Sequence, residues 1–161
     1  MLKISLTNSD LFALVDDEDF PVLSRINWLL DANGYVKNRM FYMHSLILGF
    51  PSNRVTDHID HDRCNNQKSN LRLATQQQNR FNQKQRQGAL SQYKGVTRTP
   101  SSRIKPWKAQ IAKTIDGKLT RFHIGCFATE EQAAIAYDRK ARELFGDFAY
   151  INLPLHLTSQ D

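Results

Sequence analysis

Hydrophobic positions in the first third of the chain occur in brief runs separated by Asn, Asp and Gly. Residues 3–7, 12–16 and 35–39 are three such runs, alternating or β-rich, and they predict short strands. Residues 17–30 start with acidic side chains and continue with apolar ones. Because acidic side chains favour a helix N-terminus, this segment predicts a short helix. The N-terminal region is therefore expected to be rich in β-structure.

The middle of the chain alternates between apolar and polar segments over short distances. Residues 43–50 predict one or two turns of apolar helix, ended by a glycine and a proline. Residues 55–59 and 71–74 predict two short strands around a polar loop. Thr75 is suited to cap a polar helix that continues to about Gln85. The order strand, loop, strand, helix is therefore expected here.

The pattern changes after a small, polar segment at residues 88–92, which is a plausible linker. Residues 93–98, 107–113 and 118–127 then predict three strands. An Asp-Gly pair just before the third strand is typical of a tight hairpin.

Residues 128–147 predict a helix that packs on these strands. Thr129 and Gln132 form a capping box at its start, and Gly146 ends it. The apolar face at helical spacing consists of Ala133, Ala134, Ala136, Tyr137, Ala141 and Leu144. The predicted fold class is α+β: a β-rich N-terminal region, then a three-stranded antiparallel sheet packed on one helix.

Charge is distributed unevenly along the 161 residues, whose net charge is +6 with a pI of about 9.5. Residues 1–50 carry four Lys/Arg against six Asp/Glu, residues 51–90 seven against three, and residues 91–161 eleven against seven. The middle and C-terminal parts are therefore the basic ones. This distribution favours a polyanionic partner without identifying it.

The two cysteines, Cys64 and Cys126, are far apart in the sequence, and the chain has no C-x-x-C pair. A thiolate zinc site and a disulfide framework are therefore not expected. The N-terminus has no apolar run of signal-peptide type, and no stretch approaches the length of a transmembrane helix. We expect a soluble, cytoplasmic protein with no membrane contact and no small-molecule cofactor. Nothing in the sequence identifies a protein partner.

His, Asp and Asn side chains are dense between residues 57 and 79. Asp57 and His58 end the first predicted strand, and Asn79 lies on the predicted helix, so a strand–loop–strand–helix arrangement would bring them together. Asp57 and Asn79 could then hold one hard divalent cation through oxygen atoms. His58, the next residue on an extended strand, points the other way from Asp57 and is suited to take a proton from water.

The segment VTDHIDHDRCNNQKSNLRLATQQQNRFN resembles the HNH, or ββα-metal, nuclease motif of phage and intron homing endonucleases. The resemblance covers about residues 35–85, since D-H-I-D, N-N and N-L-R occur together at the family spacing. It implies Asp57 and Asn79 as ligands of one Mg²⁺ or Mn²⁺ ion and His58 as the general base. It also implies that Asn70 ties the loop together by hydrogen bonds and orients His58.

Two further histidines have two interpretations each. His61 stands where the family pattern usually has glycine, so either the loop is less tight or His61 contacts phosphate. His44 lies in MHSLILGF, a segment that resembles the one usually preceding the motif. It is either a structural histidine on an apolar helix or part of the site. Asp60, Asn65 and Asn66 are expected to form the loop, because Asx side chains cap turns.

Basic and aromatic residues recur on the predicted C-terminal strands. A twisted sheet can lay such side chains into a major groove, although a basic face can also be merely solvated. YKGV, W-K-A-Q-I, H-I-G-C-F-A-T-E-E-Q-A-A-I-A-Y-D and the terminal N-x-P resemble the Apetala/ethylene-response-factor DNA-binding domain over about residues 92–155. That resemblance implies a sheet that reads the major groove.

The DNA contacts expected from strand position and from this resemblance are Lys94, Thr97, Arg98, Gln110, Arg121 and His123. Lys94 and Arg121 are both expected to project from strands toward the groove. Thr97, Gln110 and His123 stand where plant factors of the family place Arg, Glu and Trp, so a plant target sequence is not implied.

The combined hypothesis is a metal-dependent HNH endonuclease acting on double-stranded DNA in a phage or bacterial host cell, similar to homing endonucleases. One alternative is a DNA-binding regulator with an inactive nuclease module. Another is an RNA-binding module, which is weaker because the aromatics do not form a row for stacking.

The predicted domains are residues 1–87 for the nuclease with its ββα motif at about 55–85, 88–92 for the linker, 93–155 for the reader and 156–161 for a tail. The role of residues 1–40 stays open.

Overall fold

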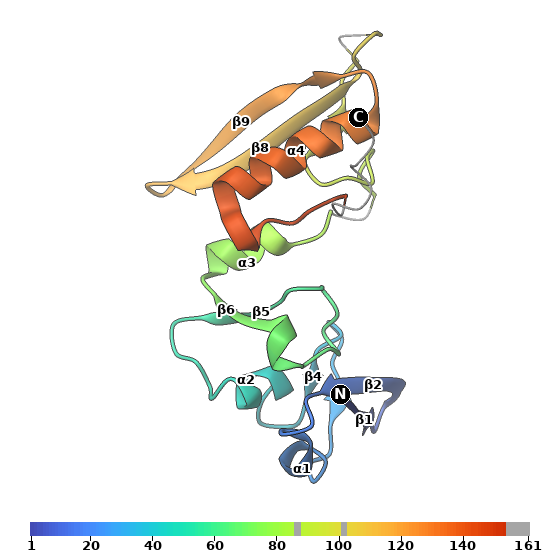
Figure 1. Cartoon of the computed structure of the whole chain (residues 1–161), viewed down its shortest axis with the longest axis vertical. Helices are drawn as coiled ribbons and strands as arrows, with labels where there is room; N and C mark the ends of the chain where they lie inside the picture. Colours follow the sequence, from blue (N-terminus) through green and yellow to red (C-terminus); the bar gives the residue numbers. More distant parts are fainter. Residues whose placement is uncertain (86–87, 101–102, 154–161) are drawn as a thin grey trace. The chain divides into compact units, whose positions relative to one another are not determined.

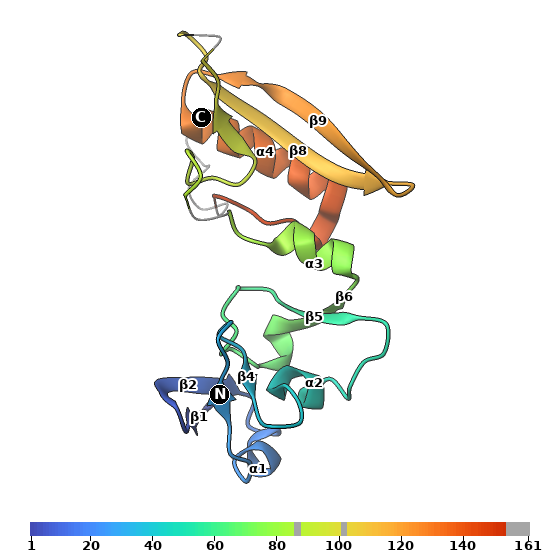
Figure 2. The same cartoon turned by 180° about the vertical axis from the view of Figure 1, so that it is seen from behind.

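A computed structural model describes residues 1–85, 88–100 and 103–153, and the predicted tail at 156–161 lies outside these ranges. The chain forms two compact units, residues 1–79 and residues 80–161 (Figures 1 and 2). No helix in the described ranges is long and apolar enough to cross a membrane.

The first unit begins with short strands, as its hydrophobic pattern predicts. Strands β1 (Leu2–Leu6) and β2 (Ser9–Val15) form an antiparallel hairpin, and β3 (Leu29–Leu30) pairs with β4 (Val36–Lys37). The helix expected within residues 17–30 is reduced to one turn, α1 (Phe20–Leu23). The chain leaves that helix early because Trp28 turns back into the core, where its Nε1 donates to the Leu23 carbonyl at 2.8 Å.

An apolar core holds these strands together. Its largest fully buried side chains are Val15, Leu23, Trp28, Val36 and Met43. Met43 begins helix α2 (Met43–Ile47), the apolar helix expected at this position. The N-terminal strands are therefore part of the hydrophobic body of the first unit, and α2 packs on that body.

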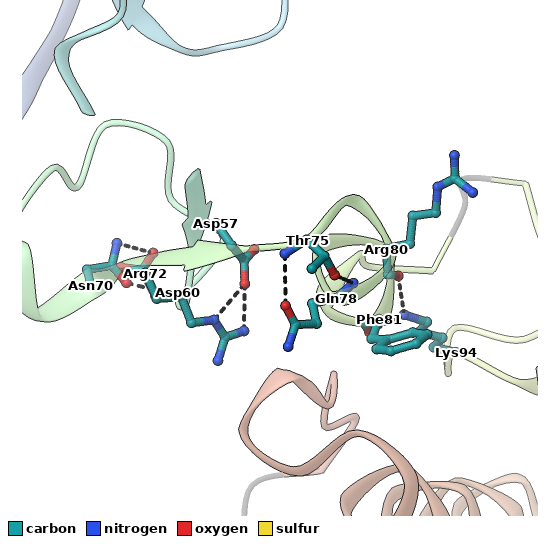
Figure 3. A network of polar contacts seen from close by, with 9 residues as sticks. All are labelled: Asp57, Asp60, Asn70, Arg72, Thr75, Gln78, Arg80, Phe81 and Lys94. Atoms are coloured by element: carbon teal, nitrogen blue, oxygen red, sulfur yellow. Dashed lines mark hydrogen bonds and ion pairs between the residues drawn. The ribbon is translucent and has the colours of Figure 1, made fainter. Parts of the chain in front are cut away.

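The strand–loop–strand–helix segment follows α2. Strand β5 (Val55–His58) pairs antiparallel with β6 (Leu71–Ala74), a 3-10 turn η1 (Lys68–Asn70) precedes β6, and helix α3 (Gln76–Asn82) follows it. Thr75 caps α3 as expected: its Oγ1 accepts from the Gln78 amide at 3.1 Å, and Gln78 Oε1 accepts from the Thr75 amide at 2.8 Å (Figure 3). This reciprocal pair is a capping box, and it fixes where α3 begins.

The second unit is a sheet with one long helix across it (Figure 1). The sheet has the order β7 (Val96–Arg98), β8 (Trp107–Ile115), β9 (Lys118–Phe127), all antiparallel. Asp116 and Gly117 close the β8–β9 hairpin with φ of 48° and 75°, which is the reason an Asp-Gly pair stands there. The predicted α+β fold class is confirmed.

Helix α4 (Glu130–Phe145) covers one face of this sheet and is followed by the 3-10 turn η2 (Gly146–Phe148). The Gln132 amide donates to Thr129 Oγ1 at 3.2 Å, as the capping pattern predicts. The buried residues facing the sheet are Ala133, Ala134, Tyr137 and Ala141. Their small size allows close packing, and a Cβ on Gly95 would lie 2.1 Å from the Tyr137 ring.

The second unit starts before the predicted linker at residues 88–92. The Phe81 ring stacks on Phe145 with centroids 3.7 Å apart, and the Tyr150 amide donates to the Phe81 carbonyl. Ser91, inside the predicted linker, is buried and donates to Glu130 at 2.6 Å. The aromatic pair at Phe81 explains why the compact unit includes the residues from Arg80 onward.

Candidate active site

Asn70 holds together the loop between β5 and β6. Its Oδ1 accepts from the Asp60 amide at 3.0 Å, and its Nδ2 donates to Asp60 Oδ1 and to the Asn65 carbonyl, both at 2.8 Å. Its own carbonyl accepts from the Ile59 amide at 2.9 Å. Because Asn70 is buried, these bonds are shielded from water and fix the loop that follows His58 (Figure 3).

The Asp60 carboxylate accepts hydrogen bonds from three groups of this loop. Burial raises the pKa of Asp60, but hydrogen bonds from Asn65, the Asp62 amide and Asn70 outweigh it and leave the pKa below its usual value. His61, next in the chain, has a φ of 67° and donates from its amide to the His58 carbonyl at 3.1 Å. This is the left-handed conformation that favours glycine, so the loop keeps its tight turn with histidine at the strained position.

The loop is also attached to the core of the first unit. The Leu14 amide donates to the Cys64 carbonyl and the Asn66 amide donates to the Leu14 carbonyl, both at 2.8 Å. Asn66 is fully buried, and its side chain donates to the Arg63 and Cys64 carbonyls. Asp60, Asn65 and Asn66 thus form the loop, and strand β2 gives that loop a fixed support.

Asp57 lies on β5 directly opposite Arg72 on β6. Its carboxylate is buried, and Oδ2 accepts from Arg72 Nε at 2.8 Å and from Nη2 at 2.6 Å (Figure 3). Arg72 is a site residue that the sequence argument did not single out, although N-L-R was recognised as part of the motif. The signal that finds it is the antiparallel register, which places residue 72 across from residue 57.

His58 is buried beside Asp57. Burial lowers the pKa of its imidazole, while hydrogen bonding with Asn66 and the negative charges of Asp60 and Asp57 act in the opposite direction. The net shift is downward, so the ring is neutral at neutral pH and has a lone pair for a proton. The ring lies 5.4 Å from that of His44 at an angle of 87°, and 5.9 Å from Tyr35.

His44, on α2, is only 8% exposed. It stacks on Tyr42 with centroids 5.2 Å apart and meets Tyr35 edge to face. Burial, and to a smaller extent the nearby His58, lowers its pKa to about 4, so this ring is neutral as well. Its buried Nδ1 has no hydrogen-bond partner among the residues that the structure describes. His44 thus lies on the short helix α2 with its ring against that of His58, and its part in the site stays a prediction.

A cavity of about 450 Å³ opens beside these histidines. It is lined by Tyr35, Tyr42, His44, Ser45, Phe50, Pro51, Arg54, Val55, Thr56 and Asn79. The fold therefore brings Asn79 and His44 to one cavity, with His58 in ring contact with His44. Asp57 is on the neighbouring part of β5 and faces Arg72.

The residues present suit a hard divalent cation with an incomplete protein shell. No group of three His, Cys, Asp or Glu side chains able to hold a metal exists in the described part of the chain. With one cation between them, Asp57 would supply a carboxylate and Asn79 an amide oxygen, a donor set that Mg²⁺ accepts because it keeps several waters and takes phosphate oxygens. Asn79 lines the cavity, whereas Asp57 is not among its lining residues. The guanidinium of Arg72 forms an ion pair with Asp57 Oδ2.

Most of the expected DNA-contacting residues of the second unit lie on the sheet face away from α4. Gln110 pairs with His123, and Arg121 is two residues from His123, so their side chains share one face. Thr97 pairs with Lys108 on the same face, whereas Arg98 alternates to the other face. Arg121 and His123 are exposed.

The expectation that Lys94 projects from a strand is wrong. Strand β7 begins at Val96, and Lys94 lies in the turn before it. Its Nζ donates to the carbonyls of Phe81 and Gln83, each at 2.6 Å, and to that of Arg80 at 3.4 Å (Figure 3 draws Arg80, Phe81 and Lys94). Burial lowers the pKa of this ammonium to about 8. A lysine satisfies the last carbonyls of a helix well, so this side chain is held at the end of α3.

Comparison with known proteins gives two kinds of relative. The HNH endonuclease family model matches residues 47–81. An uncharacterized HNH endonuclease, L560, of Acanthamoeba polyphaga mimivirus is 37% identical over 150 residues, which cover 88% of this chain and 74% of that protein.

Two plant proteins match the C-terminal half. Dehydration-responsive element-binding protein 2E of Oryza sativa subsp. japonica is 43% identical over 68 residues, and protein 2D of Arabidopsis thaliana is 40% identical over 67. Each match covers 42% of this chain but only 20% and 30% of the plant proteins. No solved structure matches the chain. Both resemblances found in the sequence are confirmed.

Proposed function

The chain belongs to the HNH endonuclease family, and on that premise we propose that it is a metal-dependent DNA endonuclease. In this proposal it hydrolyses a phosphodiester bond at the site around His58 and is directed to double-stranded DNA by sheet β7–β8–β9. The observation that carries the proposal is the state of His58. It is a buried, neutral imidazole next to Asp57, at the start of a loop that Asn70 fixes.

The proposed chemistry assigns one role to each residue. His58 accepts a proton from water, and the hydroxide attacks phosphorus in line. Asn70 keeps the loop closed, so the backbone that carries His58 does not move during proton transfer. Asp57 and Asn79 would hold a divalent cation, Mg²⁺ or Mn²⁺, which supplies charge stabilisation for the phosphate and the departing 3′ oxygen. The products of this cleavage are a 5′-phosphate and a 3′-hydroxyl.

The second unit is the proposed reader. Thr97, Gln110, Arg121 and His123 share the face that would enter a major groove, and a sheet can read base edges there. Tethering this reader to the nuclease raises the effective concentration of the cutter at a site. This is a division of labour like that of a homing endonuclease. The proposed setting is the cytoplasm of a phage-infected or bacterial cell.

One observation favours a second candidate, a DNA-binding protein whose nuclease unit is inactive. Arg72 already occupies Oδ2 of Asp57, the only carboxylate of the proposed ligand pair. If no cation can replace Arg72 there, the chain binds DNA without cutting it.

A plasmid-nicking assay separates the two candidates. Supercoiled plasmid is incubated with the protein in Mg²⁺, in Mn²⁺ and in EDTA, and the conversion to relaxed or linear forms is measured. We expect cleavage with either cation and none in EDTA. Asp57→Asn should remove cleavage, whereas Asp10→Asn, an exposed carboxylate in the same unit, should leave it unchanged. Cleavage in EDTA would contradict the metal mechanism, and DNA binding without cleavage under all conditions would favour the inactive protein.

A further inference from the structure

The ion pair between Asp57 and Arg72 is the most buried one that the structure describes. The Asp57 side chain is 5% exposed and that of Arg72 16%, whereas at least one partner in each of the other described ion pairs is much more exposed. Two contacts of the guanidinium, from Nε at 2.8 Å and from Nη2 at 2.6 Å, converge on one oxygen, Oδ2. The pair joins β5 to β6 at directly opposed positions.

A carboxylate this deep in the protein needs a counter-charge, because an isolated buried charge is strongly disfavoured. Arg72 supplies that charge in the free protein. Arginine keeps its proton under all ordinary conditions, so the contact cannot be released by deprotonation. It can be released only when another cation takes the place of the guanidinium on Asp57.

A divalent cation on Asp57 would be such a replacement. It would bring positive charge to the carboxylate that Arg72 now neutralises, and two cations at one carboxylate repel each other. The Arg72 side chain is also long and flexible, and 16% of its surface is exposed to solvent. The guanidinium therefore has a route to move away from Oδ2 without unfolding the strand pair.

We propose that Arg72 is a built-in counter-cation that holds Asp57 in the metal-free protein and competes with the divalent cation for it. Arg72 is thus a positioning residue: it preserves the site before the metal arrives and weakens metal binding by the free protein. This inference rests on the proposed function, because it takes Asp57 as a metal ligand. It adds that metal uptake requires displacement of a residue of the chain itself.

The test measures metal binding directly, with the full chain and without DNA. Mn²⁺ is titrated into the protein, and free Mn²⁺ is followed by electron paramagnetic resonance. Arg72→Gln removes the charge but keeps a polar side chain of similar reach. Arg25→Gln removes a charge at an exposed position of the same unit and is the matched control. A charge-assisted hydrogen bond corresponds to about a ten- to hundredfold change in an equilibrium constant, so Arg72→Gln should bind Mn²⁺ about that much more tightly than the parent.

Thermal unfolding gives a second readout. Without metal, Arg72→Gln should unfold at a lower temperature than the parent, because Asp57 has lost its counter-charge. Saturating Mn²⁺ should raise the unfolding temperature of Arg72→Gln more than that of the parent or of Arg25→Gln, because the ion restores the missing charge.

A measurement on the unaltered protein covers the case in which Arg72→Gln does not fold. The Nε–H of Arg72 gives a distinct ¹H–¹⁵N resonance when it is hydrogen bonded and buried. Saturating Mg²⁺ should shift or broaden this resonance together with those of Asp57 and Asn79. Mg²⁺ binding at Asp57 and Asn79 with the Arg72 resonance unchanged would overturn the inference.

The outcomes separate this inference from the proposed function. Equal Mn²⁺ affinity in the parent, Arg72→Gln and Arg25→Gln means that Arg72 does not compete, and the inference is wrong while the metal site stands. No Mn²⁺ binding in any of the three proteins means that the metal site is wrong, and the inference is overturned with it.

Discussion

The two units of this protein put polar residues in opposite places. In the first unit the polar side chains of the proposed site, Asp57, His58 and Asn70, are buried, and the strands around them are short. In the second unit the core is apolar and contains mainly alanine and aromatic residues, while Arg121 and His123 stand exposed on the sheet. Chemistry on a phosphate benefits from groups fixed in a dry site, whereas reading DNA needs groups on the surface.

The difference extends to what stabilises each unit. The first unit buries a carboxylate and two imidazole groups, and the buried carboxylate, Asp57, has Arg72 as its partner. The second unit has a buried carboxylate too, Asp138, but this residue accepts from the amides of Asn152 and Leu153 and closes the C-terminal segment on α4. Its buried polar group therefore supports the fold and leaves the exposed sheet face to bind a partner.

Removing one histidine from each unit should affect cleavage in one case and DNA binding in the other. His58→Ala should lower the cleavage rate by about 10²–10⁴-fold, since a general base contributes that much, and should change DNA affinity by no more than a few-fold. His123→Ala should weaken DNA binding and leave the rate at saturating DNA unchanged. Single-turnover cleavage and a binding titration measure both effects. Equal cleavage by His58→Ala and the parent would remove His58 from the mechanism.

A change of pH should affect the units differently. The pKa of His44 is about 4 in the folded state against about 6.5 when unfolded, so between these values the unfolded chain binds the additional proton. Acidification from about pH 7 to about pH 4 should therefore cost the first unit stability, on the order of 3 kcal/mol from His44 alone. The lowered pKa of His58 acts in the same direction.

The second unit should not lose stability in this range. Burial raises the pKa of Asp138, so its protonation is easier in the folded state and acidification is favourable there. Lys94, with a pKa of about 8, is charged in both states below neutral pH and contributes no change. Hydrogen exchange on the full chain, corrected for the intrinsic rate, reports each unit separately. Parallel loss of protection in both units would contradict this contrast.

The smallest expected effect distinguishes base reading from charge on the reader sheet. Arg121→Ala should cost about 1–3 kcal/mol of binding free energy at one base position, because Arg121 and His123 form one exposed patch. Lys108→Ala should weaken binding to all sequences alike and lower the salt slope by about one unit. Binding over a salt series against sites randomised base by base measures both. A uniform loss from Arg121→Ala would make it a phosphate contact.

Local sequence determined the elements and their limits. The capping box at Thr75 and the N-cap at Thr129 fix the starts of α3 and α4, because the bonds they make lie within one turn. The Asp-Gly pair fixes the β8–β9 hairpin through its positive φ values. The motif residues Asp57, His58, Asn70 and Asn79 were also singled out from sequence, because they lie in one continuous strand–loop–strand–helix segment that resembles the HNH motif, and their roles stay predictions.

Tertiary structure decided which side chains meet across that segment and across the chain. The partner of Asp57 is set by the register of β5 on β6, and the neighbour of His58 is His44, which comes from a separate helix. The sequence pattern predicted Lys94 on a strand, yet its ammonium lies at the end of α3. The last carbonyls of that helix have no partner within the helix, and the ammonium donates to them. Local patterns indicate which secondary structure a residue favours beside its sequence neighbours, whereas burial and long-range strand pairing determine which side chain or carbonyl it contacts.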